Sequence, residues 1–255
     1  MQLNKKIIKF KPLTEFVEKI LPAPDSATSF IPKWYRNLPS YYNGGSSPRY
    51  SDDKDSFDLT AKKCIPMLDS MCSGYMLRTQ ADMLFDFDEN GKRTVTWKTP
   101  DMDVAFSSKN FQYTLISMHE TEQVGDYPIP EGYGTEIFKF NNLWVVETPK
   151  EYSCLFMHPL GRMDLPFYSL HGMVDSDIYN SNPIHIPFVI KKDFVGIVEA
   201  GTPYAQLIPI PREHWRHEIL KSGDALYDYV NQLAKINLKI QGWYKKNVWK
   251  RKEYR

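Results

Sequence analysis

The chain is predicted to fold as a mainly β protein with a sandwich-like core, an extended N-terminal arm and a C-terminal helix. Short apolar segments separated by turn residues recur through its middle, a pattern typical of sandwiches and barrels. The 255 residues include 18 prolines and 13 glycines, which supply those turns. After Asp224 the apolar spacing changes to a helical period. We therefore expect an arm over residues 1–59, a β core over 60–212 and a helix with a basic tail over 213–255, packed as one structural unit.

The N-terminal arm is expected to be extended because six prolines interrupt the first fifty residues. Proline fixes φ and lacks a backbone donor, so a long regular element is excluded there. One helical turn is expected over residues 13–20. The aromatic residues between 31 and 42 would be costly to leave in water, so Trp34 and Tyr35 are expected to clamp the arm on the body. Recognition of a partner by this arm is the alternative.

A hairpin over residues 83–97 is the clearest element of the core. Met83, Phe85 and Phe87 alternate with Leu84 and Asp86, and Val95 and Trp97 alternate with Thr94 and Thr96. The turn between them, Asp88-Glu-Asn-Gly91, ends in Asn-Gly, which accepts positive φ. This alternation predicts that one face of the hairpin packs on a core. Further strands are expected at residues 112–118, 134–140, 144–148, 153–158, 185–190, 196–199 and 206–210.

Two further segments carry weaker or different patterns. Residues 60–74 mix small and apolar side chains, which fits a short helix or a buried strand. After the cap sequence Ser-Gly-Asp224, apolar residues follow at helical spacing, so a helix covering a sheet face or edge is expected. These apolar residues are Leu226, Val230, Leu233, Leu238 and Ile240.

Composition and charge exclude several classes of protein. The net charge of +1 gives no global field for nucleic acid or acidic substrates. Residues 244–255 hold six basic and one acidic residue, a net of +5, so this tail could contact nucleic acid, lipid or an acidic partner, or simply be solvated. The three cysteines have no framework spacing, which indicates a reducing compartment. The chain lacks a signal peptide and any run of the ~18 apolar residues that a membrane helix needs, so we expect a soluble protein of the cytoplasm or a virion.

Metal and nucleophile chemistry have little support in the sequence. None of the six histidines forms a strand pair at i, i+2 beside a carboxylate, and the chain has no nucleophile elbow or phosphate loop. Cys154 lies in an apolar strand, where a thiol is usually a packed hydrophobe. A metal-dependent oxygenase site would require His171, His185 and a carboxylate to converge.

An acidic loop over residues 172–179 is the best candidate for chemistry. Asp175 at a turn between strands could orient a water for attack on phosphorus, with Arg162 and Gln206 holding phosphate. The alternative is that Asp175 and Asp177 cap a turn through local backbone bonds.

The loop and a later segment resemble the β-clip fold of dUTPases and dCTP deaminases. Gly172, Met173, Val174, Asp175 and Tyr179 resemble that family's sugar and water-positioning loop, with Tyr179 one residue late, and the segment Gly201-Thr-Pro-Tyr-Ala-Gln206-Leu-Ile resembles its Ala-Gln segment near the triphosphate. The resemblance implies that Asp175 is catalytic, that Tyr179, Arg162 and Gln206 bind ligand, and that Mg²⁺ would accompany a nucleotide. The serine expected beside Arg162 and the glycine-rich C-terminal arm are missing.

The chain as a whole resembles uncharacterised proteins of tailed bacteriophages. The segments Ile31-Pro-Lys-Trp-Tyr35, Cys64-Ile-Pro-Met-Leu-Asp69 and Gly74-Tyr75 carry this likeness, together with the Gly201 segment. The leading hypothesis is a phage-type protein whose dUTPase-like core binds a nucleotide or other small ligand without hydrolase activity. Any activity that remained would be that of a nucleotide pyrophosphatase. The alternative is a virion structural or assembly protein whose arms contact other subunits, and either would be a homo-oligomer.

Overall fold

The computed structural model describes residues 6–41, 59–97, 114–219, 224–238 and 243–254. The chain divides into two compact units. One unit, here the β unit, comprises residues 1–30 and 74–212. The other, the helical unit, comprises residues 31–73 and 213–254.

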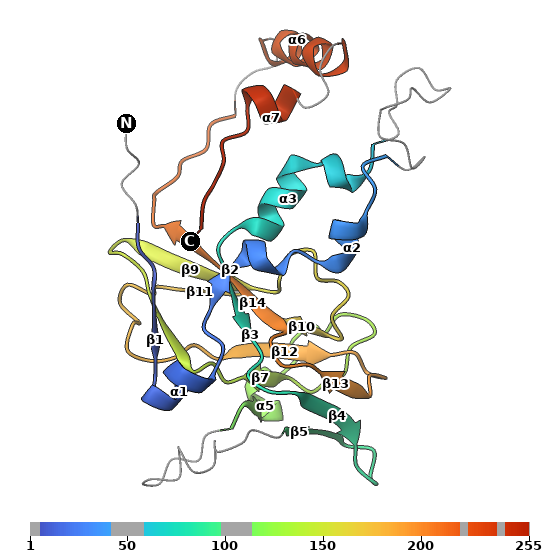
Figure 1. The fold of residues 1–255 in the computed structure, drawn as a ribbon, viewed down its shortest axis with the longest axis vertical. Coiled ribbons are helices and arrows are strands. Elements are labelled where there is room, and N and C mark those ends of the chain that lie inside the picture. Colours follow the sequence, from blue (N-terminus) through green and yellow to red (C-terminus); the bar gives the residue numbers. More distant parts are fainter. Residues whose placement is uncertain (1–5, 42–58, 98–113, 220–223, 239–242, 255) are drawn as a thin grey trace. The chain divides into compact units, whose positions relative to one another are not determined.

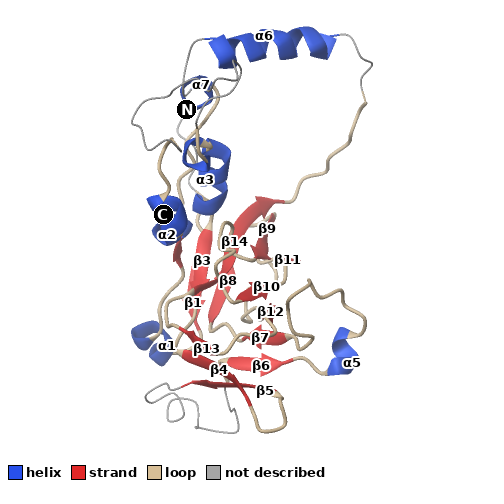
Figure 2. Ribbon diagram, turned by 90° about the vertical axis from the view of Figure 1, so that its right-hand side faces the viewer, coloured by secondary structure: helices blue, strands red, loops and turns tan. Residues whose placement is uncertain are grey.

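The β unit is built from four antiparallel sheets among the described residues, which confirms the mainly β, sandwich-like prediction (Figures 1 and 2). A five-stranded sheet has the order β11 (Gly172–Val174), β9 (Tyr152–Met157), β14 (Pro203–Pro211), β3 (Tyr75–Arg78) and β2 (Asp25–Ser26). A four-stranded sheet has the order β10 (Phe167–Ser169), β12 (Ile186–Ile190), β7 (Phe138–Phe140) and β6 (Ile116–Met118). The two smaller sheets are β13 (Gly196–Val198), β4 (Met83–Phe87) and β5 (Arg93–Trp97), and β1 (Lys9–Pro12) with β8 (Trp144–Glu147).

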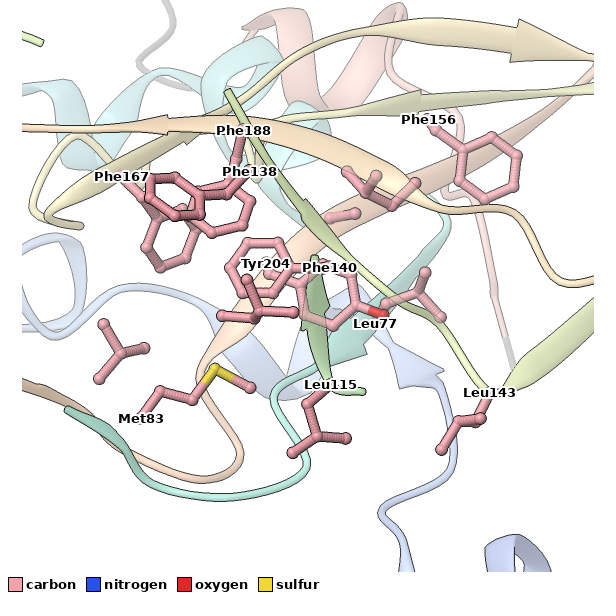
Figure 3. Close-up of a cluster of buried hydrophobic side chains, with 14 of the residues drawn as sticks. Leu77, Met83, Leu115, Phe138, Phe140, Leu143, Phe156, Phe167, Phe188 and Tyr204 are labelled. Carbon is pink, nitrogen blue, oxygen red and sulfur yellow. The ribbon is translucent and has the colours of Figure 1, made fainter. Parts of the chain in front are cut away.

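Aromatic rings from different sheets form the core of the β unit (Figure 3). Phe140 of β7 stacks on Phe188 of β12 with ring centroids 3.9 Å apart, and on Tyr204 of β14 at 4.4 Å. Phe138 and Phe167 pack edgewise or stacked against Phe188. Alternate strand residues face the same side, which brings Phe138 with Phe140, and Ile186 with Phe188, to one face of their sheet. Val189 and Ala205 at the intervening positions are buried as well, so β12 and β14 are covered on both faces. Apolar burial of this kind is the main stabilising term of the unit.

The hairpin forms where it was predicted. β4 and β5 pair from Met83↔Trp97 to Phe87↔Arg93, and Met83 and Phe85 are fully buried. Phe87 is exposed instead of continuing the buried face, and the Arg93 guanidinium lies 4.3 Å from its ring. Arg93 itself is buried and donates to the carbonyls of residues 191, 192 and 194, so it ties the hairpin to the segment that precedes β13.

The N-terminal residues belong to both units instead of forming one separate arm. β1 pairs with β8, β2 pairs with β3, and α1 (Glu15–Ile20) forms at the expected helical turn. From Ile31 onward the chain enters the helical unit, so the boundary expected at residue 59 differs from those seen at Phe30 and Ser73. The prolines divide this region into short segments, each long enough for one strand. Such segments pair at the edges of the sheets, where proline is tolerated, instead of lying over them. Residues 42–58 of the expected arm lie outside the described residues.

The helical unit contains α2 (Lys33–Asn37), α3 (Ile65–Cys72), α6 (Asp224–Leu238) and α7 (Trp243–Asn247). Lys62 donates to the carbonyls of Tyr35 and Arg36 at the end of α2, where a cation complements the helix dipole. Within this unit the Tyr35 ring is buried, whereas Trp34 is exposed. Trp249 and Lys252 both donate to Asp69 of α3, which ties the basic tail into the unit.

The C-terminal helix begins at Asp224, as predicted. The described side chains from 225 to 230 are all exposed. The part of the chain that the structure describes has no helix with the length and apolarity required to cross a membrane.

Candidate functional site

The four predicted site residues lie at opposite ends of strand β9. β11 pairs with β9 so that Val174 is opposite Cys154, which places Asp175 beside Ser153 at the first end. β14 pairs with β9 so that Gln206 is opposite Met157 at the other end. The four residue steps from Ser153 to Met157 span about 13 Å of extended chain.

At the Ser153 end, Asp175 is held by protein partners. The Ser153 hydroxyl donates to the Asp175 carboxylate at 2.6 Å, and the Arg212 guanidinium lies 3.4 Å from the same oxygen. Backbone N–H groups of Ile178 and Tyr179 both bond to the Asp175 carbonyl, so the residue closes a turn. The turn is closed by the main-chain carbonyl, whereas the Asp175 carboxylate bonds residues that are remote in sequence instead of the local backbone.

Asp177 and Arg212 form a clamp that closes the loop. The two terminal nitrogens of the Arg212 guanidinium each donate to one Asp177 carboxylate oxygen, which makes a bidentate pair. The Glu151 N–H donates a third hydrogen bond to the same carboxylate. The hydrogen bonds from Arg212 lower the pKa of Asp177 to about 2. The Arg212 N–H also bonds the Glu151 carbonyl, so the end of β14 is fixed to the turn before β9. Protein groups alone therefore hold this loop to the ends of β9 and β14.

At the Met157 end, Gln206 is fully buried. Its side-chain oxygen accepts the Leu160 N–H at 2.9 Å, so it satisfies a backbone donor in the turn after β9. Arg162 forms a bidentate pair with Asp164, at 2.9 Å from Nε and from Nη2. Burial raises the pKa of Asp164, but the bonds from Arg162 lower it below its ordinary value overall. Gln206 and Arg162 are thus brought to one end of the strand, but both side chains engage protein groups.

A chain of aromatic and histidine rings lies at the same end. His158 is only 6% exposed, and its Nδ1 accepts the Ser169 N–H while its Nε2 donates to the Arg162 carbonyl. The ring stacks on Tyr168 at 4.7 Å, and the Tyr168 hydroxyl shares a hydrogen bond with exposed His171. Burial lowers the pKa of His158 to about 4, which keeps the ring neutral near pH 7. With both nitrogens bonded and the ring buried, His158 positions the turn and is not available as a proton acceptor.

Sequence reasoning did not single out the partners that fix these two ends. Arg212 follows β14 and meets Asp177 across 35 positions, and Ser153 meets Asp175 across 22 positions. No local pattern marks such pairs, since strand pairing alone brings them together. Tyr179, which was expected to contact a sugar, is half-exposed in the same turn as Asp175 and lies at the end of β9 remote from Gln206.

A metal site would require His171, His185 and a carboxylate to lie close together. Within the described ranges no group of three or more His, Cys, Asp or Glu side chains could hold a metal ion. His171 bonds to Tyr168, whereas His185 is half-buried, and burial followed by nearby Lys139 lowers the pKa of His185. A neighbouring cation disfavours a divalent ion at His185.

The helical unit contains a segment whose large apolar side chains are exposed. Residues 213–219 form neither helix nor strand, and each is exposed; Trp215 is 85% exposed and Ile219 is 88% exposed. The described side chains of α6 continue this pattern with Leu226, Tyr227, Tyr229 and Val230, all more than half exposed. We call residues 213–219 and 225–232 the exposed C-terminal segment.

Comparison of the chain with protein-family models and with curated proteins gives no match.

Proposed function

We propose that the chain is a structural or assembly protein of a tailed bacteriophage, and that its exposed C-terminal segment docks on another protein chain. The observation that carries this proposal is the set of six large apolar side chains in that segment, each more than half exposed. Large apolar side chains left exposed along one segment are typical of protein interaction sites. The likeness to phage proteins, given by the sequence segments above, supplies the setting.

The energetics favour docking over permanent exposure. Burying a large apolar side chain stabilises by roughly 1.5–3 kcal/mol, so burial of most of these six side chains would contribute roughly 10 kcal/mol. Association costs at least about 4 kcal/mol in lost translational and rotational freedom. The segment therefore carries enough unused apolar surface to support a stable contact.

Helix α6 gives a second reason. A 15-residue helix is marginally stable in water unless an amphipathic face packs on something. Leu226, Tyr229 and Val230 follow the helical spacing of such a face and are exposed. A docked partner would supply the packing.

The geometry gives less support to the nucleotide hypothesis. Asp175 and Gln206, which would orient water and hold phosphate, lie at opposite ends of β9 in one chain. Gln206 is buried and bonded to Leu160, and Arg162 is paired with Asp164. An assembly role does not require the side chains of Asp175, Arg162 or Gln206 to be available for a ligand.

Quantitative mass spectrometry of purified particles tests the proposal. The chain is expected at a fixed ratio to the other particle proteins. A double variant, Trp215→Ser with Ile219→Ser, is expected to reduce that ratio, whereas the matched control Glu213→Ser with His217→Ser changes exposed polar neighbours and is expected to preserve it. Absence of the wild-type chain from the particles, or equal incorporation of both variants, would overturn the proposal.

A further inference from the structure

We propose that the partner of the exposed C-terminal segment is a second copy of this chain, and that the segment docks on the outer face of the sheet β13–β4–β5. This inference rests on the proposed docking function and names its partner. Three observations carry it: opposite charges on the two units, an acidic-rimmed apolar patch on the β unit, and the apolar segment itself.

The two units carry opposite net charges. Residues 1–30 and 74–212 contain 16 Lys and Arg against 21 Asp and Glu, a net of −5. Residues 31–73 and 213–254 contain 15 Lys and Arg against 10 Asp and Glu, a net of +5. The helical unit of one copy is therefore attracted to the β unit of another. A copy of the same chain supplies the complementary charge without any further partner.

The outer face of β4 and β13 presents an apolar centre. Met83 and Phe85 are buried, so alternation turns Leu84 to the opposite, solvent side of β4. Ile197 of β13 is the register partner of Leu84 and points to the same side. Leu84 is 41% exposed and Ile197 is 59% exposed.

Carboxylates surround this apolar pair. Asp86 lies in β4 two residues after Leu84, so it is on the solvent side of the sheet. Asp82 directly precedes β4 and Glu199 directly follows β13, and the β13–β4 register brings these two strand ends together. All three are exposed. Asp82 and Asp86 also accept backbone N–H bonds from Ala200 and Phe87, which holds them in place. We call Asp82, Leu84, Asp86, Ile197 and Glu199 the acidic-rimmed patch.

The exposed C-terminal segment matches the centre of this patch through its apolar side chains, Trp215 and Ile219. The segment itself holds three carboxylates and one cation (Glu213, Glu218, Asp228 and Arg216), so cations for the rim would come from the basic tail of the same unit. Lys245 and Lys246 of α7 are exposed. An apolar centre with a charged rim is the usual arrangement of a protein interface.

Reciprocal docking would give a two-fold symmetric dimer. Each copy contributes one segment and one patch, so the dimer contains two identical contacts. A substitution in the chain therefore weakens both contacts. Buried aromatic side chains dominate such contacts, and Trp215 is the largest candidate.

Sedimentation equilibrium of the purified full chain is the primary experiment. We expect a dimer at low salt whose dissociation constant rises with salt, because surface charges are screened. The double variant Trp215→Ser with Ile219→Ser, and separately Leu84→Asp, are each expected to raise the dissociation constant about 100-fold, about tenfold per contact. The control Met118→Asp changes an equally exposed apolar side chain (43%) on the edge strand β6 and is expected to leave the dimer intact. Circular dichroism melts establish that each variant is folded.

A mixing experiment separates docking from general destabilisation. The segment variant and the Leu84→Asp variant are each expected to be monomeric alone, but a mixture retains one intact segment and one intact patch. Partial recovery of a heterodimer in the mixture, observed with differently tagged chains, would support the proposal.

Three results would overturn it. These are a wild-type monomer at every salt concentration, a dimer that survives Leu84→Asp, and a monomer whose helical unit instead binds nucleic acid. A monomeric chain that is present in purified particles would refute the self-docking inference and leave the assembly function standing. A dimeric chain that is absent from particles would refute the assembly function and leave the self-docking inference standing.

Discussion

Buried His158 should make the stability of the β unit depend on pH. Its ring is 6% exposed and bonded through both nitrogens, as acceptor from the Ser169 N–H and as donor to the Arg162 carbonyl. A proton on Nδ1 would remove the acceptor that Ser169 uses and bury a charge. Burial therefore lowers the pKa of His158 from 6.5 to about 4.

The sign and magnitude follow from linkage. In the unfolded chain the histidine takes up a proton near pH 6.5, whereas in the folded chain it does so only near pH 4. Between these values the unfolded state binds more protons, so stability falls as pH is lowered from 6.5 to about 4. The difference between the two pKa values corresponds to about 3 kcal/mol of unfolding free energy.

The assay is urea denaturation of wild type and His158→Asn from neutral pH down to about pH 4. Asparagine keeps an oxygen that can accept the Ser169 N–H but does not titrate, so the variant should be about 1 kcal/mol less stable at neutral pH, from the lost Nε2 bond. On acidification the difference should move by about 3 kcal/mol in favour of the variant. Contributions from His185, Glu147 and Asp177 are common to both proteins and cancel.

A matched control removes a neighbouring hydrogen bond without changing any titrating group. Ser169→Ala deletes the bond from the Ser169 hydroxyl to the Tyr204 carbonyl. Its stability curve should lie below and parallel to that of wild type. If the His158→Asn curve is also parallel to wild type, the reasoning from burial is wrong.

Three further outcomes are expected. Gly74 has φ +75°, and a Cβ there would meet the Leu207 carbonyl oxygen at 1.8 Å, so Gly74→Ala should destabilise by about 2 kcal/mol or more in thermal melts. Gly91→Ala has the same φ with open space around it and should cost only about 1 kcal/mol; equal losses would remove the steric argument. Arg93→Met leaves three carbonyl acceptors without their donor and should lower the unfolding free energy by about 3 kcal/mol, whereas exposed Lys92→Met should be neutral in the same urea titration. Deoxynucleoside triphosphates with Mg²⁺ are expected to leave the melting temperature unchanged, and a clear rise would restore the nucleotide hypothesis.

Local patterns were sufficient for several elements. The Asn-Gly turn and the alternation of Met83 and Phe85 predicted the β4–β5 hairpin, and the change of period after Asp224 predicted the start of α6. These elements were predictable because their signals, turn chemistry and side-chain period, lie within a dozen consecutive residues. The same locality explains which strands were not predicted. They are short, and they are strands because of the neighbours with which they pair: β1, β2, β3, β10 and β11.

The arrangement of the candidate site could not be predicted from the sequence. The residue types needed for a ligand were visible, but their positions relative to one another depend on strand register. The β11–β9 and β14–β9 pairings place Asp175 and Gln206 at opposite ends of β9. Register also brings Arg212 to Asp177, a pair that converts the acidic loop into a clamp.

The sequence by itself determined that this is a mainly β chain with one hairpin of known position, a C-terminal helix and a basic tail, since these depend on composition and short-range period. Tertiary structure alone decided which polar side chains are buried, which carboxylates are paired, and which apolar side chains remain exposed. Burial and pairing depend on contacts between residues far apart in the chain, and their energies are therefore set by the packing of the whole β unit.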